Sequence, residues 1–420
     1  MKFANKKLLI LGGKPIGSCE IVEYAKSEGA YVIVTDYLSK NMSAAKRIAD
    51  ECWDISTGDI EELKKMIISQ KIDGIYTGVH EFNITKMIEL CEQLNIHCYC
   101  TSEQWDRVDN KRKFKDMCIK YGIPVSKEYK IFDYCNNKEL EEIKYPVIVK
   151  PVDGSGSRGF SICNNCETFK EGYQKAMKFS PTSSVLIEQC MDYRNSVIIN
   201  YTIVDGKIIY SSMGDKKSKK VTENGAPTMS AVIYPSIYEQ DYLKELDENV
   251  KKMFIEEGYR NGVIWIEAFC DNGNFTFNEM GYRFGGSLTY HVVKHRTGID
   301  QLALQVEYSL NGKNDKLDIS SFNPPDDVYM ILPVHLKAGK ITRIEGIEKL
   351  KLNPNLKQIV FVHYIGDVIE DWGSAHQVFA YIHFVEKNRK LANEFAKYIV
   401  DTIKVYDENG NQMLYNLYFE

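Results

Sequence analysis

The first hundred residues alternate between short apolar runs and segments whose apolar residues recur every three or four positions. The apolar runs predict β-strands, and the periodic segments between them predict amphipathic helices. The strands are expected at 7–13, 30–37, 51–56, 72–78 and 96–100, and the helices at 16–29, 59–70 and 82–95. This alternation predicts a doubly wound parallel sheet.

The alternation ends near residue 105, where a charged amphipathic helix is followed by a series of strands. We expect one helix over 105–124, closed by Gly122 and Pro124. Two later stretches alternate apolar and polar residues on either side of a turn signal, and they predict hairpins that turn at 204–207 and 271–274. The remaining expected strands are 128–132, 145–152, 160–163 and 185–190, and a helix is expected at 299–310.

We expect three domains within an α/β fold, because 420 residues are too many for one ordinary core. The doubly wound domain covers 1–108. An α+β domain of two lobes covers 109–312, with its smaller lobe at about 125–190. The C-terminal unit is expected at 313–420. It contains a break with two prolines at 323–325, and the residues after this break predict a mixed α/β lobe.

Composition argues against several classes of protein. Apolar residues make up 44% of the chain and charged residues 26%, as in ordinary globular proteins. The net charge of −5 gives no electrostatic reason to expect nucleic acid or an anionic membrane as a partner, and no apolar run is long enough to span a bilayer. The first apolar run stops at Gly12 and Gly13, too early for a signal peptide, so we expect a cytoplasmic protein. The eleven cysteines, including Cys98 and Cys100 on one face of an expected strand, are then interpreted as reduced packing thiols.

A loop rich in glycine and serine follows an apolar strand that ends in Lys150. The loop contains Ser155, Gly156, Ser157 and Gly159. Glycines let backbone N–H groups close around an anion, and hydroxyl and amine groups add donors, so the loop is a candidate cradle for a triphosphate. It is not a Walker A loop, because no GK[ST] sequence opens a following helix. A flexible hairpin turn is the alternative interpretation.

Two glutamates, Glu267 and Glu279, lie on opposite arms of the second expected hairpin. Each has apolar neighbours, among which an ionised carboxylate is costly unless it is paired or binds a metal. The turn at 271–274 would place them side by side, facing one Mg²⁺ ion. Arg283 follows four residues after Glu279, so a salt bridge between these two is the alternative interpretation.

Taken in order, these features resemble the ATP-grasp superfamily, particularly the branch that contains biotin carboxylase, carbamoyl-phosphate synthetase and amino-acid ligases. The resemblance covers most of the chain. Besides the N-terminal sheet domain, it rests on the stretches NKRKFKDMCIKYGIP, YPVIVKP with its glycine loop, VLIEQCM, and IEAF…FNEMGYRFGGS…TGID. It implies a domain that binds ATP together with Mg²⁺ or Mn²⁺.

The resemblance also implies roles for individual positions. Arg283 and Lys150 are expected to be catalytic, with Arg283 stabilising the reacting carboxylate, and Glu267 and Glu279 are expected to bind the metal. Glu188 is expected to take the adenine amino group. The full set of nucleotide-binding residues implied is Lys111, Lys150, Ser155, Gly156, Ser157, Gly159, Glu188, Gln189, Met191 and Asn195.

Two positions depart from the pattern of many relatives. Asn195 stands where many have a glutamate that contacts ribose, although an amide can still hydrogen-bond a hydroxyl. Gly281 stands where many have an asparagine that ligates metal, so the number of bound metals is left open between one and two.

The substrate side is expected at the carboxyl edge of the N-terminal sheet, where Glu81 follows a strand. The stretch 214–229 holds four lysines and is expected to form a loop over the site, with a solvated surface loop as the alternative. His291 and His295 are candidates for substrate contact or, equally, for packing.

The implied activity is an ADP-forming ligase that phosphorylates a carboxylate and couples the acyl phosphate to an amine. The alternative is carboxy-group activation of the biotin carboxylase or carbamoyl-phosphate synthetase kind. Two other hypotheses are an NAD-linked dehydrogenase, suggested by the N-terminal sheet and Asp36, and a nucleotide-binding protein without catalysis. The expected partners are small-molecule carboxylates and amines, without nucleic acid or membrane, and a homodimer is left open.

Overall fold

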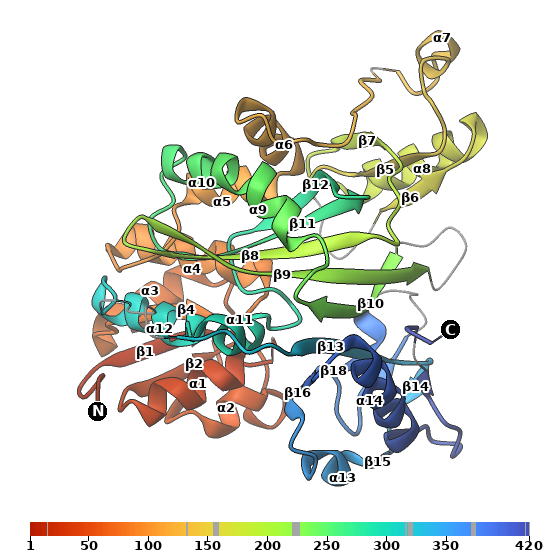
Figure 1. Ribbon diagram of the computed structural model, residues 1–420. Helices are drawn as coiled ribbons and strands as arrows, with labels where there is room; N and C mark the ends of the chain where they lie inside the picture. Colours follow the sequence, from red (N-terminus) through yellow and green to blue (C-terminus); the bar gives the residue numbers. More distant parts are fainter. Residues whose placement is uncertain are drawn as a thin grey trace.

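The computed structural model describes residues 1–420 except 15, 132, 154–158, 221–226, 316, 318–321, 371–374, 416 and 420. Figure 1 shows a mixed α/β molecule, with a red-to-orange N-terminal unit, a yellow-to-green central region and a blue C-terminal region. In the part of the chain so described, no helix combines the length and apolar character needed to cross a membrane. The domain boundaries expected at 108/109 and 312/313 stay predictions.

The N-terminal unit is a four-stranded parallel sheet in the order β3-β2-β1-β4. Its strands are β1 (Lys7–Leu11), β2 (Tyr31–Thr35), β3 (Glu51–Trp53) and β4 (Gly74–Thr77). Its helices are α1 (Ser18–Ser27), α2 (Ala44–Ile48), α3 (Ile60–Gln70) and α4 (Glu81–Leu94). β1, β2 and β4 are mostly buried apolar runs, as expected for a parallel sheet covered by helices, whereas the edge strand β3 is only partly buried. The predicted doubly wound sheet is therefore confirmed.

The strand predicted at 96–100 is wrong, since these residues form no regular element. Consequently Cys98 and Cys100 do not share the face of a strand. Instead, Tyr99 ties the segment to the central region, because its hydroxyl donates to the Tyr282 carbonyl while the Tyr282 hydroxyl donates to the Tyr99 carbonyl. A tertiary contact across 183 residues thus replaces the sheet pairing that the apolar pattern suggested.

The single helix predicted over 105–124 is wrong as well, because two helices occupy this region, α5 (Ser102–Asp109) and α6 (Lys111–Lys120). The break falls at Asn110, whose backbone is extended and whose side chain accepts from the backbone N–H groups of Arg112 and Lys113 in α6. Asparagine is a strong N-cap, so it starts a new helix instead of continuing the old one.

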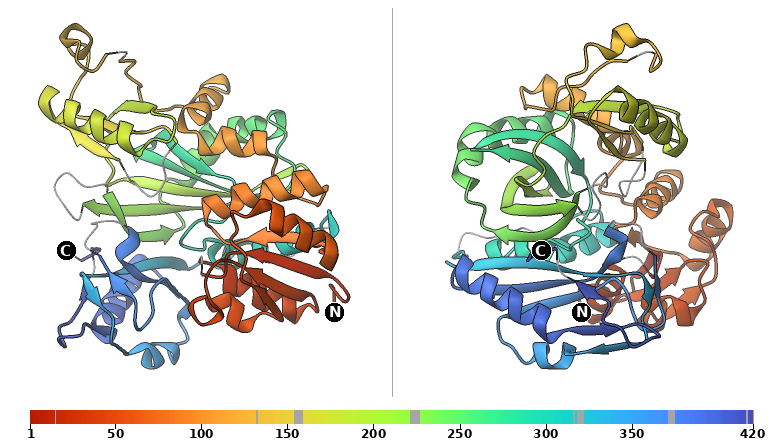
Figure 2. Two further views of the ribbon diagram at one scale, coloured as in Figure 1. Left: turned by 180° about the vertical axis from the view of Figure 1, so that it is seen from behind. Right: turned by 90° about the vertical axis from the view of Figure 1, so that its right-hand side faces the viewer.

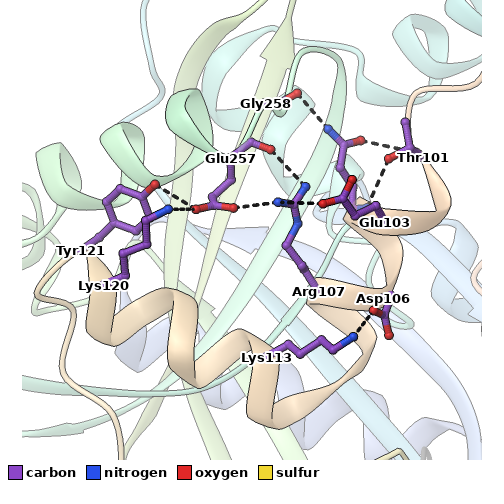
Figure 3. A network of polar contacts seen from close by, with 10 residues as sticks. Thr101, Glu103, Asp106, Arg107, Lys113, Lys120, Tyr121, Glu257 and Gly258 are labelled. Atoms are coloured by element: carbon purple, nitrogen blue, oxygen red, sulfur yellow. Dashed lines mark hydrogen bonds and ion pairs between the residues drawn. The ribbon is translucent and has the colours of Figure 1, made fainter.

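A polar network holds both helices against the central region (Figure 3). Glu257 follows α10 (Asp247–Glu256), and its carboxylate accepts from Arg107 of α5 at 2.8 Å and from Lys120 at the end of α6 at 2.7 Å. The Tyr121 hydroxyl donates to the same carboxylate at 2.9 Å. The network therefore ties α5 and the C-terminal end of α6 to the residue that follows α10.

A small lobe stands above the large sheet in Figure 1 and has a core of its own. It contains α7 (Asn137–Leu140), β5 (Val147–Pro151), β6 (Ser161–Cys163), α8 (Cys166–Phe179) and β7 (Val185–Gln189). The antiparallel order is β6-β5-β7. The strand predicted at 128–132 is not formed over its described residues 128–131, where Glu128 makes an isolated bridge to Glu188.

The large sheet has nine strands and runs through the central and C-terminal regions in the order β12-β11-β8-β9-β10-β13-β18-β16, with β20 also on β13. Its members are β8 (Ser196–Val204), β9 (Lys207–Lys220), β10 (Pro227–Tyr234), β11 (Gly262–Asp271), β12 (Asn274–Gly281), β13 (Val328–Leu336), β16 (Leu356–Phe361), β18 (Val378–Glu386) and β20 (Leu414–Tyr415). Both predicted hairpins are confirmed. The second turns at Asn272 and Gly273, each with positive φ, as a two-residue hairpin turn requires.

The loop predicted at 214–229 is largely strand, and that expectation is corrected. β9 continues to Lys220 and β10 begins at Pro227, while 221–226 lie outside the described residues. Alternate residues of a strand face the same side, so the lysines of β9 are divided between the two faces of the sheet.

Helices and short strands complete the molecule (Figure 2). The additional helices are α9 (Glu239–Glu245), α11 (Tyr290–Thr297), α12 (Gln301–Asn311), α13 (Ile347–Lys351) and α14 (Arg389–Thr402), with single 3-10 turns at Lys40–Met42 and Ala375–Gln377. The short strands are β14 (Gly339–Lys340), β15 (Arg343–Glu345), β17 (Val368–Ile369) and β19 (Lys404–Tyr406). The helix predicted at 299–310 is confirmed as α12, and the C-terminal region is mixed α/β as expected.

Candidate active site

A cavity of about 320 Å³ is lined by the small lobe, the β11–β12 hairpin and the N-terminal unit. Charged side chains from several elements converge on it. They are Glu81, Asp109, Lys111, Lys150, Lys216, Glu267, Glu279 and Arg283. Apolar residues, among them Ile148, Ile162, Met191 and Phe269, line the remainder. The cavity therefore offers both an apolar wall and a dense set of charges.

Glu267 and Glu279 face each other across the hairpin, where their Cα atoms are register partners. Burial, together with the neighbouring Glu267 carboxylate, raises the pKa of Glu279. Lys216 of β9 forms an ion pair with Glu267 and compensates one of the two charges. Paired carboxylate oxygens are the ligands that Mg²⁺ prefers, so these residues fit a metal ion of that kind.

Lys150, on β5, belongs to a buried ionic cluster that is centred on the Glu188 carboxylate. Its Nζ is 2.6 Å from Oε2 of Glu188, and Lys115 Nζ is 2.5 Å from the other carboxylate oxygen of Glu188. Ser126 donates to the same carboxylate at 2.6 Å. Burial favours the neutral acid, but Lys150 and Lys115 outweigh it and lower the pKa of Glu188 to about 2. In this arrangement Glu188 is an ionised partner that fixes Lys150.

Lys111 is the first residue of α6 and lines the same cavity. Burial lowers the pKa of Lys111, the Glu279 carboxylate opposes that shift, and the Lys150 ammonium adds to it. Two ammonium groups that line one cavity are suited to bind an anion that carries several charges.

Arg283 follows β12 and bonds to the N-terminal unit. Its Nη2 donates to Oε1 of Glu81 at 2.7 Å, and its Nη1 donates to the Phe284 carbonyl at 2.8 Å. The guanidinium also lies over the Trp265 ring, 5.2 Å from the ring centroid. Among the described ion pairs none joins Arg283 to Glu279, so the alternative interpretation of that pair is wrong. Glu81 lies at the carboxyl edge of the sheet, as predicted, and directly beside Arg283.

The structure explains why Gly281 departs from the usual pattern. Trp265 is its register partner on β11, and a Cβ atom at position 281 would lie 2.3 Å from Cε2 and Nε1 of the indole. No side chain fits there while the ring keeps this position. The Trp265 indole therefore occupies the space into which a ligand at position 281 would have to project.

Several predicted residues lie elsewhere or are not described. Gln189 and Asn195 are exposed and are not part of the described cavity lining, although Met191 is. Gly159 has positive φ but does not line the cavity either. Positions 155–157 of the glycine loop lie outside the described residues.

The two candidate histidines make contacts away from the cavity. His291 Nε2 lies 2.9 Å from Oε2 of Glu20 on α1, and His295 Nε2 lies 2.9 Å from Oδ2 of Asp327. Neither is in the described cavity lining. Their contacts favour the packing interpretation.

The comparisons with known proteins agree with this geometry. Residues 110–312 match the family model of the carbamoyl-phosphate synthase L chain, ATP-binding domain. The homologues of this chain are ATP-grasp ligases. One is the phosphoribosylamine–glycine ligase of Fusobacterium nucleatum subsp. nucleatum, 21% identical over 334 residues, which cover 76% of this chain and 78% of that protein. Another is the carbamoyl phosphate synthase large chain of Clostridium beijerinckii, 22% identical over 86% of this chain but only 35% of that protein.

Solved ATP-grasp structures show the same fold along almost the whole chain. The L-amino acid ligase from Bacillus licheniformis superposes with a TM-score of 0.75 at 18% identity, covering 96% of this chain and 99% of that one. The biotin carboxylase domain of the Hydrogenobacter thermophilus 2-oxoglutarate carboxylase, solved as a complex with MgADP, gives a TM-score of 0.77 at 17% identity, covering 97% and 91%. At these identities the likeness establishes the ATP-grasp fold and leaves the substrate undetermined.

Sequence reasoning missed four residues that the ATP-grasp geometry brings to the cavity or to its lysine cluster. Lys115 lies one helical turn after Lys111, so its i+4 spacing was a usable signal. Lys216 was noted only as one of several lysines in an expected loop. Trp265 and Asn278 sit within two residues of the glutamates, but only the register of the hairpin shows that both line the cavity.

Proposed function

We propose that this protein is an ATP- and Mg²⁺-dependent ligase that converts a carboxylate to an acyl phosphate and joins it to an amine, releasing ADP and phosphate. The observation that carries the proposal is that Lys150, Glu279 and Arg283 line a single cavity. The first is a cation suited to phosphate, the second belongs to a pair suited to a metal, and the third suits a carboxylate. The ATP-binding family model over the same region supports the nucleotide assignment.

The charges of the cavity account for the nucleotide and the metal. Lys111, Lys150 and Lys216 would surround the phosphate chain, and Glu267 with Glu279 would hold Mg²⁺. When bound, Mg²⁺ supplies positive charge that stabilises the transferring phosphoryl group. Positioning by the lysines supplies the rest of the phosphoryl-transfer catalysis.

The Arg283–Glu81 pair supports an amino acid as the activated carboxylate. An α-amino acid carries a carboxylate and an ammonium group a few ångströms apart. The guanidinium of Arg283 can bind that carboxylate through parallel hydrogen bonds, and the carboxylate of Glu81 can accept from the ammonium. The 2.7 Å contact between the two protein groups would then be exchanged for two contacts with substrate.

The proposed reaction has two steps that balance. A carboxylate oxygen of the substrate attacks the terminal phosphorus of ATP, and the bond to ADP breaks. The amine nitrogen then attacks the acyl carbon, phosphate leaves with the electrons of the C–O bond, and the nitrogen loses a proton. Arg283 stabilises the negative charge on the carboxylate oxygens in both steps.

Carboxy-group activation is the second candidate. Biotin carboxylase structures superpose as well as that of the amino acid ligase, and bicarbonate is also a small oxyanion that Arg283 could bind. The two activities share the nucleotide chemistry and differ in the acceptor. They are therefore separated by substrate and not by ATP hydrolysis alone.

The test is ATP consumption with identified products. The protein is incubated with ATP, Mg²⁺ and pairs of amino acids, with simple carboxylates plus amines, and with bicarbonate. ADP and phosphate formed only with a carboxylate–amine pair support the ligase, and a response to bicarbonate alone supports the second candidate. Release of AMP and pyrophosphate would overturn both. Arg283→Ala should abolish turnover, whereas Arg343→Ala, an exposed arginine on β15, should leave it unchanged.

A further inference from the structure

Asn278 is an extra residue on β12, created by a β-bulge. The strand register pairs Glu267 with Glu279 and Ala268 with Phe277, which leaves Asn278 without a partner of its own on β11. A bulge sets two residues of one strand against one residue of the other. Successive residues of a regular strand face opposite sides, yet Asn278 and Glu279 both line the cavity. The bulge thus turns a neutral amide into a site otherwise built from charges.

The amide oxygen of Asn278 is already used within the protein. It accepts a hydrogen bond from Lys150 Nζ at 3.3 Å, and the same Nζ lies 2.6 Å from Glu188. Among the hydrogen bonds of the described residues, none uses the Asn278 Nδ2 group as donor. An asparagine side chain carries two N–H donors, so this amide presents donors next to the ammonium group of Lys150.

The position of Asn278 along the cavity indicates what these donors face. On β5, Ile148 lies two residues before Lys150. On β11, Phe269 lies two residues after Glu267. All four side chains line the cavity. Each strand therefore passes from an apolar side chain to a charged one. Asn278 accepts a hydrogen bond from Lys150 of β5, and it directly precedes Glu279, the register partner of Glu267 on β11. A nucleotide has the same division, with a flat base joined to an anionic phosphate chain.

We propose that Asn278 is a nucleotide-binding residue, whose Nδ2 group donates to a phosphate oxygen while its Oδ1 holds Lys150 in place. The inference rests on the proposed use of ATP in this cavity. Asn278 would add a neutral hydrogen-bond donor to the three lysines of the cavity. Such a donor can bond a phosphate oxygen without adding charge beside the two glutamates proposed to bind the metal.

The test is the dissociation constant for ADP, measured by calorimetry on the full-length protein. Asn278→Leu keeps the volume and removes the donors, so affinity should fall about tenfold. Asn278→Asp also removes the donors and adds a negative charge, so affinity should fall further than with leucine. Asn278→Ala replaces the leucine variant should that protein fail to fold. Thr276→Val, on the same strand but outside the described cavity lining, is the matched control and should bind ADP normally.

The outcomes separate this inference from the ligase proposal. Unchanged ADP affinity in Asn278→Leu would overturn the assignment of Asn278 while the nucleotide site stands. Tighter binding by the aspartate variant than by the leucine variant would place a hydroxyl or an amine, not a phosphate, next to the side chain. In a Lys150→Met background, Asn278→Leu should still weaken ADP binding, and no further loss would mean that the amide acts only through the lysine. Failure of the unaltered protein to bind ADP would overturn the nucleotide site itself.

Discussion

Asp36 and Glu279 are both carboxylates that lie at an apolar strand in the sequence. In the fold, however, the charges around the two carboxylates differ. Asp36 follows β2, accepts from the Gly13 backbone N–H at 2.8 Å and lies 3.1 Å from the buried ammonium of Lys46. Glu279 instead faces a second carboxylate, Glu267, and its pKa is raised by burial and by that neighbour. The negative charge of Asp36 is therefore balanced by partners within the protein, whereas the charge of Glu279 is only partly balanced.

The difference separates a carboxylate that the protein itself satisfies from one that we propose to bind a metal. Asp36 is the residue that suggested a dinucleotide-binding domain, but its oxygens are already bonded to Gly13, Lys46 and the Ser43 hydroxyl. It has no oxygen left over for a ribose hydroxyl, which argues against the dehydrogenase hypothesis. A carboxylate placed against another carboxylate, by contrast, costs stability unless a cation binds.

The largest effect is expected from Glu279→Ala. We expect ligase turnover to fall by roughly 1000-fold, because the metal and the developing charge lose a ligand. The melting temperature without ligand should stay the same or rise, since the variant removes a carboxylate whose pKa is raised in the folded state. Coupled ADP release and thermal unfolding measure the two. Glu248→Ala, at an exposed glutamate of α10, is the control, and a clear loss of stability in Glu279→Ala would contradict the comparison.

The reverse pattern is expected from Asp36→Ala. The variant should lower the free energy of unfolding by about 3 kcal/mol, because it leaves the buried Lys46 ammonium without its buried partner. ADP affinity should not change. Asp54 pairs with the same ammonium at 2.9 Å but is largely exposed, so Asp54→Ala should cost less than about 1 kcal/mol. Urea unfolding of the two variants checks this, and equal losses would show that burial is not what separates the two carboxylates.

The sequence pattern predicted the elements well where local signals and tertiary contacts agree. β1 to β4, both hairpins and the facing glutamates follow from apolar runs and turn residues. The failures at 96–100 and at Asn110 have a different origin, because a tyrosine contact made across 183 residues and an N-cap decided those conformations. Neither signal appears in hydrophobic periodicity.

The candidate site was predictable only as a set of positions, and not as a set of contacts. Lys150, Glu279 and Arg283 were expected in one site, and the cavity brings them together. That Arg283 bonds to Glu81 could not be read from residues 202 apart in the chain. The bulge at Asn278 could not be predicted either, since the two-residue period gives no sign of where a strand gains an extra residue.

Glu188 sharpens the comparison, because it lies next to the cavity but is satisfied like Asp36. Its pKa is about 2 in the folded protein, below the ordinary value of 4.5, so the folded state favours the ionised form. The stability it contributes is therefore fully present above about pH 4.5 and is lost as the pH falls toward 2. We expect Glu188→Gln to be about 2 kcal/mol less stable at pH 7 and to converge with the unaltered protein near pH 2. Denaturant unfolding as a function of pH measures the difference, and a difference independent of pH would contradict it.

The smallest effect is expected at Trp265, which we expect to act through Arg283 on the carboxylate end of the cavity in the proposed function. The ring lies 5.2 Å beneath the guanidinium and directly opposite Gly281, so it supports Arg283 without itself carrying charge. Trp265→Phe keeps an aromatic face and should change the KM for the carboxylate substrate less than threefold. Trp265→Ala should raise that KM about tenfold, because it removes roughly 1 kcal/mol of cation–π stabilisation together with the packing of the ring. The KM for ATP should stay constant, because the lysines that we propose to bind phosphate lie on other elements. A rise in both KM values, or no rescue by phenylalanine, would mean that Trp265 acts as general packing and that the two ends of the cavity are not separable.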